Sequence, residues 1–246
     1  MSYPINYPTP QNCDVQIFYG QNKGASANAP IQDFDWIKPK GTSFVWFTLI
    51  GGGGGGGNSD ATNNQGGGGS GAVTNCLMPA FLVPDQLKVR NDSSSTVFIT
   101  YQGQNLAAGY DLLSAVGGGV GSALTGGTGG TASVRTAFAA AGLYQSVAGQ
   151  NSASAGNVTP SNTTFLSAGS TTGFTVRSNY GYPTGATTDG TGFFQISPII
   201  VGRGGTRTTA GDGICGGVGC GGGGASTTVG AVGGVGGQSL AVIISW

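Results

Sequence analysis

Acid–base chemistry in this chain would have to rest on aspartate, because the 246-residue sequence contains no histidine and no glutamate. A pair of carboxylates can cleave glycosidic bonds, but none of the aspartates stands in the apolar context that raises a carboxyl pKa. The sequence therefore predicts no catalytic residues and a protein that is not an enzyme. The nine acidic residues are Asp14, Asp33, Asp35, Asp60, Asp85, Asp92, Asp111, Asp189 and Asp212.

Metal binding has two candidate residue sets, and neither predicts a site. Asp33, Asp35 and Asp212 could ligate calcium, although turn capping is the commoner role of aspartates beside glycine. The cysteines contain no Cys-x-x-Cys pair, and without histidine they make a poor zinc site. We therefore expect no metal and no cofactor. The four cysteines are Cys13, Cys76, Cys215 and Cys220.

The cysteine pair near the C-terminus leaves two interpretations open. Cys215 and Cys220 could close a small disulfide loop across the glycines between them. The interpretation we favour is buried or half-buried thiols, because a reducing cytosol disfavours disulfides.

One segment is typical of a recognition loop. Tyr180 and Tyr182 stand among small residues, with Asn179 before them and Pro183 after. Tyrosine supplies a rigid contact surface that suits a saccharide or a protein partner. Local packing of these tyrosines over a sheet is the alternative. Asn179, Tyr180 and Tyr182 are the candidate binding residues.

Charge and hydropathy exclude several other partners. Nine basic residues balance nine acidic ones, which leaves too little positive charge for nucleic-acid binding. The glycines form no phosphate-binding loop motif with lysine. The N-terminus lacks a basic region followed by an apolar core, and no run reaches about 18 apolar residues. We therefore expect no secretory signal and no membrane insertion.

The elements that would position these residues are short β-strands. Alternating or continuous apolar runs predict strands near 13–19, 43–50, 73–101, 174–201 and 240–246. No helix-period pattern extends far enough to form a helical layer. The expected fold is all-β, an antiparallel β-sandwich or jelly-roll-like core with long, ordered glycine-rich insertions.

Two strands carry the strongest pattern. The run 43–50 is apolar on both faces, so it needs cover on both sides. We predict that it pairs with the run 240–246 in one sheet. The aromatic cluster around the first run, Trp36, Phe44, Trp46 and Phe47, is expected to be core or subunit interface rather than a ligand site.

Residues 1–12 form a separate region ahead of a single glycine-rich β domain, 13–246. This region alternates proline with tyrosine, asparagine and isoleucine, which predicts an extended arm. We expect the arm to bury against another subunit.

Glycine supplies 51 of the 246 residues, mainly in the blocks 51–71, 117–130 and 202–237. Such tracts are commonly flexible tethers, because glycine loses more backbone entropy on ordering than any other residue. Backbone hydrogen bonds between closely packed extended segments, as in polyproline II-type bundles, can offset that loss. Our hypothesis is that the blocks lie against one another or against sister subunits.

The order of motifs resembles the glycine-rich domain of bacteriophage tail and virion structural proteins. Phe34, the turn Pro39-x-Gly41 and an apolar strand lead into Gly51–Gly57, as at the opening of that domain. The run from Gly221 to Trp246, glycines followed by an apolar strand, is similar to its ending. The region between is less glycine-clustered than the pattern, so the middle is expected to fold in its own way.

This resemblance implies a structural or adhesive virion component rather than an enzyme. We expect a homo-oligomer, with a trimer favoured, on a fibre or tail tip or as a capsid decoration. Made in the host cytoplasm, it would contact other virion proteins and a host surface saccharide or protein. A cellular extracellular or filament-forming glycine-rich protein is the alternative.

Overall fold

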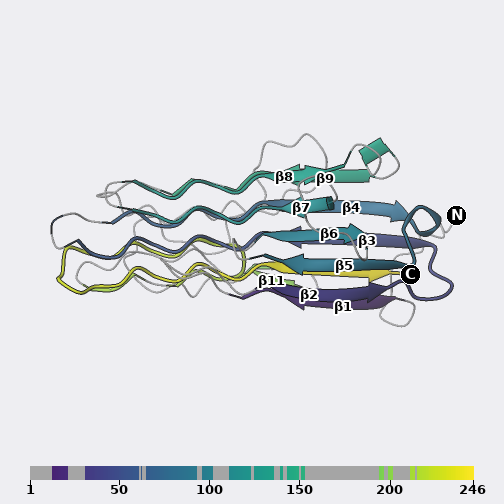
Figure 1. The fold of residues 1–246 in the computed structure, drawn as a ribbon, viewed down its shortest axis with the longest axis horizontal. Coiled ribbons are helices and arrows are strands. Elements are labelled where there is room, and N and C mark those ends of the chain that lie inside the picture. Colours follow the sequence, from purple (N-terminus) through teal and green to yellow (C-terminus); the bar gives the residue numbers. More distant parts are fainter. Residues whose placement is uncertain are drawn as a thin grey trace, which may run out of the picture.

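Two antiparallel sheets and a bundle of glycine segments form the part of the chain that the computed structural model describes (Figure 1). That part comprises residues 13–21, 31–60, 62, 65–92, 96–101, 111–122, 125–135, 139–140, 143–149, 151–152, 194–196, 199–201, 211–213 and 215–246.

The first sheet contains the two strongest strands of the sequence. Its strand order is β1-β12-β3-β4-β9. The predicted pairing of the runs 43–50 and 240–246 is confirmed, with Ile50 opposite Leu240 and Trp46 opposite Ile244. The strands are β1 (Asp14–Tyr19), β12 (Leu240–Ser245), β3 (Phe44–Ile50), β4 (Val73–Pro79) and β9 (Leu143–Val147).

The second sheet has the order β2-β5-β6-β7-β8 and is also antiparallel throughout. A 3₁₀ turn, η1 (Ala80–Leu82), lies on the crossover from β4 of the first sheet to β5 of the second. Its strands are β2 (Gln32–Ile37), β5 (Gln86–Asn91), β6 (Val97–Tyr101), β7 (Asp111–Ala115) and β8 (Ala132–Val134).

The inner faces of the two sheets form one hydrophobic core. Trp36 of the second sheet meets Phe47 of the first edge to face, with ring centroids 6.0 Å apart. Both side chains are fully buried. The hydroxyl of Thr74 also donates to the carbonyl of Ser114 across the core, at 2.7 Å. The predicted β-sandwich is therefore confirmed.

Several strand predictions need correction. Within the predicted strand region 73–101 the structure has three strands, β4, β5 and β6, with η1 between the first two. The segment 32–37 lies outside the predicted strands, yet it forms β2. Between β8 and β9, residues 139–140 are helical, and the amide of Ala139 donates to the carbonyl of Arg135 at 2.8 Å. In the region 174–201, the described residues form a small hairpin, β10 (Phe194–Ile196) with β11 (Ile199–Val201).

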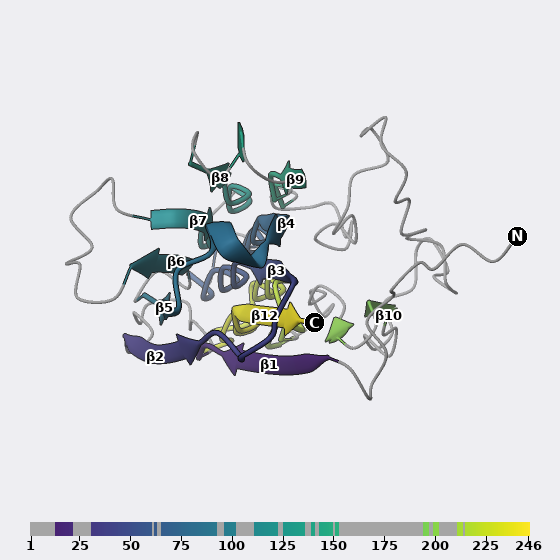
Figure 2. The same ribbon diagram turned by 90° about the vertical axis from the view of Figure 1, so that its right-hand side faces the viewer.

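The glycine segments continue the strands along the long axis of the molecule (Figure 1). Gly51 follows directly from β3, and the chain returns through Ala72 into β4. Figure 2, viewed along that axis, shows the sandwich strands in front of the glycine segments. Among the described residues, no helix is long and apolar enough to cross a membrane.

Candidate functional site

The most distinctive feature of the described chain is the bundle of glycine segments. Segment 51–57 bonds to the returning segment at every third residue, with N–O distances of 2.9–3.0 Å. Three residues per turn is the period of polyproline II, which makes no hydrogen bonds of its own. The amide donors and carbonyl acceptors are Gly51 and Ala72, Gly54 and Gly69, and Gly57 and Gly66.

The other sides of segment 51–57 are bonded as well. The amides of Gly53 and Gly56 donate to the carbonyls of Gly237 and Gly234, each at 2.8 Å. The carbonyls of Gly52 and Gly55 accept from the amides of Gly118 and Gly121, at 2.8 and 2.9 Å. Segment 219–225 is a fourth neighbour, because the amides of Gly222 and Ala225 donate to the carbonyls of Gly54 and Gly57, at 2.9 and 3.0 Å. One buried glycine segment thus bonds to four neighbouring segments through its main chain.

Close approach is the reason these positions must be glycine. A Cβ on Gly53 would overlap the carbonyl of Cys220, and one on Gly68 would overlap the carbonyl of Gly54. Positive φ is not the reason, because the described glycines with positive φ are Gly41, Gly211, Gly219 and Gly230. The hypothesis that the glycine blocks lie against one another is therefore confirmed for the described parts of the blocks.

Turns close the bundle at the end away from the sandwich. The described residues of these turns are 58–60, 62 and 65 in the first, 122 and 125 in the second, and 226–231 in the third. The first and third turns are bonded to each other, since the amide of Ser59 donates to the carbonyl of Ala231 at 2.9 Å. Asn58 and Asp60 are exposed in the first turn, and Val229 is 82% exposed in the third. This end presents side chains from separate segments on a rigid support.

The aspartates act within the fold. The carboxylate of Asp212 accepts from the amide of Val232 at 2.7 Å, which is the predicted turn-capping role. Asp33 and Asp35 instead lie within β2, and so the turn prediction is wrong for them. Arg90 of the neighbouring strand donates to Asp33 at 2.7 Å. That hydrogen bond lowers the pKa of Asp33 and raises the pKa of Arg90.

None of the four cysteines forms a disulfide. The expectation of buried or half-buried thiols is confirmed for Cys220, which is buried in the bundle, and is wrong for Cys215, which is exposed. Burial raises the pKa of Cys220 to about 12 and that of Cys76, in the sandwich core, to about 11. These two thiols are therefore protonated near neutral pH and shielded from reagents. In the described part of the chain, no cluster of three potential metal-ligating side chains occurs.

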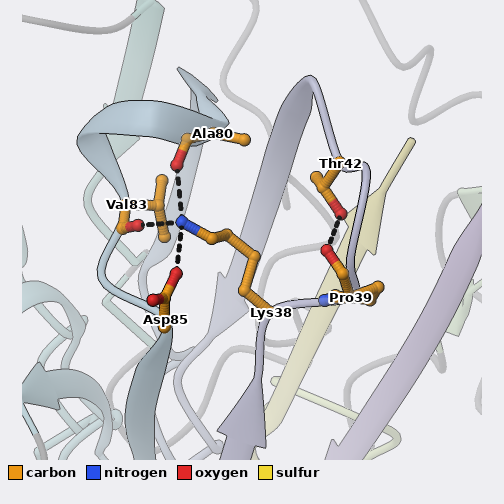
Figure 3. A network of polar contacts seen from close by, with 6 residues as sticks. All are labelled: Lys38, Pro39, Thr42, Ala80, Val83 and Asp85. Carbon is orange, nitrogen blue, oxygen red and sulfur yellow. Dashed lines mark hydrogen bonds and ion pairs between the residues drawn. The ribbon is translucent and has the colours of Figure 1, made fainter.

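A lysine fixes the crossover between the sheets at the opposite end of the sandwich (Figure 3). The ammonium group of Lys38 donates to the carbonyls of Ala80 and Val83, at 2.9 and 2.7 Å. It also pairs with the carboxylate of Asp85, at 2.9 Å. The three protons of the ammonium thus have three acceptors, and η1 is held against the end of β2.

The candidate binding residues Asn179, Tyr180 and Tyr182 lie outside the described residues, as does the arm 1–12.

The structure divides the aromatic cluster between two environments. Trp36 and Phe47 are core, whereas Phe44 and Trp46 belong to the opposite face of the first sheet. The distal turns are a site that the sequence did not predict, because their residues carry no motif and only the bundle brings them together.

Comparison with known proteins gives no match: neither a protein-family model nor a curated protein sequence is significantly similar to this chain.

Proposed function

We propose that this protein is a non-enzymatic structural component of a phage-like particle, self-associating and exposed on a fibre or tail tip or on the capsid. The observation that carries this proposal is the ordered glycine bundle, whose segments bond to one another through the main chain. Such a bundle is a stiff extension built almost without side chains. Rigid display of a contact surface is a mechanical task, and it suits a particle better than a soluble enzyme.

The distribution of charge supports the same proposal. The sequence carries no net charge, so many copies can pack closely without mutual repulsion. Within the described residues, Asp212 caps a turn, and Asp33 and Asp85 form ion pairs with Arg90 and Lys38.

We infer that exposed loops carried by the glycine bundle make the contact with a host surface. The predicted loop around Tyr180 remains one candidate. The distal turns are the second, because exposed Asn58, Asp60 and Val229 lie at the end of the bundle furthest from the sandwich. A saccharide or a protein on the host surface is the proposed partner.

Quantitative mass spectrometry of purified particles tests this function. A structural component is expected at a fixed copy number per particle. A few copies would indicate a tip, and hundreds would indicate a capsid or tube component. Absence from particles, together with recovery from cell-surface or filament fractions, would refute the proposal in favour of a cellular glycine-rich structural protein.

A further inference from the structure

The first sheet presents a second apolar face, directed away from the core. Residues alternate between the two faces of a strand. Val45, Phe47 and Leu49 enter the core, so the intervening side chains of β3 point outward. The register aligns one outward residue from each of the five strands. This outer row consists of Val15, Ile244, Trp46, Leu77 and Leu143.

The outer row is apolar across the whole sheet, yet it is incompletely covered. Leu143 is 75% exposed and Val15 39% exposed, at the two edges of the row. Beside the row, Phe44 is 42% exposed and stacks on Trp246 with ring centroids 6.0 Å apart. Closer to the bundle, Leu240 and Ile50 of the same face are fully buried. On the edge strand β1 the same face stays open toward the bundle, because Ile17 is 39% exposed and Tyr19 is 50% exposed. The uncovered apolar surface therefore comprises the outer row at the sandwich end and the outward side chains of β1 beside it.

We propose that the outer row and the Phe44–Trp246 pair are the docking site for the N-terminal arm, residues 1–12, of a second copy of this chain. This inference deepens the self-association in the proposed function and identifies the segment that mediates it.

The register of β1 places the start of the arm beside this surface. Asp14 lies opposite Ser245, and Tyr19 lies opposite Leu240, nearer the bundle. The chain therefore enters the sheet at the sandwich end, next to the exposed aromatic pair. Twelve residues in polyproline II conformation span about 37 Å, and a row across five strands spans about 19 Å. The arm is long enough to cross the whole row of a neighbour.

The composition of the arm favours a second copy over its own sheet. Pro4, Pro8 and Pro10 favour extended backbone, and residues 1–13 contain no glycine for a tight reversal. An arm that continues the line of β1 leads away from its own outer row. Its Tyr3, Ile5 and Tyr7 match the surface chemically, because proline-rich extended segments dock on aromatic-lined surfaces.

Sedimentation equilibrium of the full chain and of variants tests this arm exchange. We expect the full chain to associate reversibly and a chain lacking residues 2–12 to be monomeric. Leu143→Ser should weaken association by about tenfold or more, as expected for the loss of an interface anchor. The matched control is Ile37→Ser, since Ile37 is 64% exposed on the second sheet and should leave association unchanged.

A mixing experiment distinguishes exchange of arms between copies from association through another surface. The chain lacking its arm retains the outer row, and a Val15→Ser, Leu143→Ser chain retains its arm. Each should be monomeric alone, and a one-to-one mixture should form a heterodimer. Burial of Cys76, measured by thiol labelling, verifies that each variant is folded.

Three results would overturn the inference. The first is undiminished association of the chain lacking its arm, and the second is a full chain that remains monomeric at every soluble concentration. The third is failure of the mixture to form a heterodimer. None of these results bears on the copy number in particles, so the proposed function is tested separately.

Discussion

At the scale of single residues, the absence of a side chain is what permits the bundle. Ordering a residue costs about 1–2 kcal/mol of backbone entropy. A net hydrogen-bond contribution of about 0.5–1.5 kcal/mol is of the same order, and the glycine segments are bonded on several sides. Main chains that touch main chains also gain dispersion energy along their whole length.

Substituting alanine within one tract should distinguish close contacts from open ones. At Gly53 a Cβ meets the backbone of Cys220, which cannot move without breaking bundle bonds. We expect Gly53→Ala to lower the free energy of unfolding by about 3 kcal/mol or more. The control is Gly57→Ala, where the nearest atoms lie at 3.0 Å or beyond and the cost should be smaller. Equal costs in urea unfolding would contradict the packing argument.

The Asp33–Arg90 pair predicts a pH dependence. Because the folded-state pKa of Asp33 lies below its ordinary value of 3.8, the pair stabilises the fold above that pH. The contribution is lost as the pH falls through the lowered pKa. Asp33→Asn should therefore be less stable than the native chain at pH 7, with the difference shrinking toward about pH 2. Urea unfolding at a series of pH values measures this difference in the free energy of unfolding. A difference that does not change with pH would refute the stabilising role of the Asp33–Arg90 pair.

At the scale of elements, strand pairing selects between structures that local patterns leave open. The stretch 106–116 is ambiguous in sequence between strand and short helix, and its described part 111–115 forms β7 because β6 and β8 flank it. The weakly patterned β9 likewise forms against β4. Runs that are apolar on both faces, such as β3, are predicted correctly since few other structures can accommodate them.

The crossover held by Lys38 offers a test at this scale. Lys38→Met keeps the aliphatic chain but leaves the carbonyls of Ala80 and Val83 without their donor. We expect a loss of about 1–3 kcal/mol in the free energy of unfolding. Asp85→Ala removes an acceptor that is 93% exposed, and it should cost less than about 1 kcal/mol. A reversed order in thermal or urea unfolding would contradict the network.

At the scale of the whole molecule, the sandwich and the bundle are one continuous structure. The strands β3, β4, β7 and β12 lead directly into glycine segments or follow from them. The sandwich thus anchors the ends of the segments, and the bundle needs no core of its own.

The two buried cysteines report on the two parts separately. Cys76 lies in the sandwich core and Cys220 in the bundle, whereas Cys215 is exposed. A thiol reagent should modify Cys215 rapidly, and it should modify Cys76 and Cys220 only when their surroundings open. If the parts unfold together, both buried thiols become reactive at the same urea concentration. Rapid labelling of Cys220 in the native protein would refute the packed bundle.

Residue types and their period along the chain were enough to predict the fold class and the pairing of the two strongest strands. The strands follow from local periodicity, and their pairing follows because runs that are apolar on both faces need the covered centre of a sheet. Tertiary contacts were needed to establish which glycines touch, which turns share the distal end and which apolar residues form the outer row. A glycine carries no side chain to specify a partner, so its neighbours are determined by the register of the strands that hold each segment.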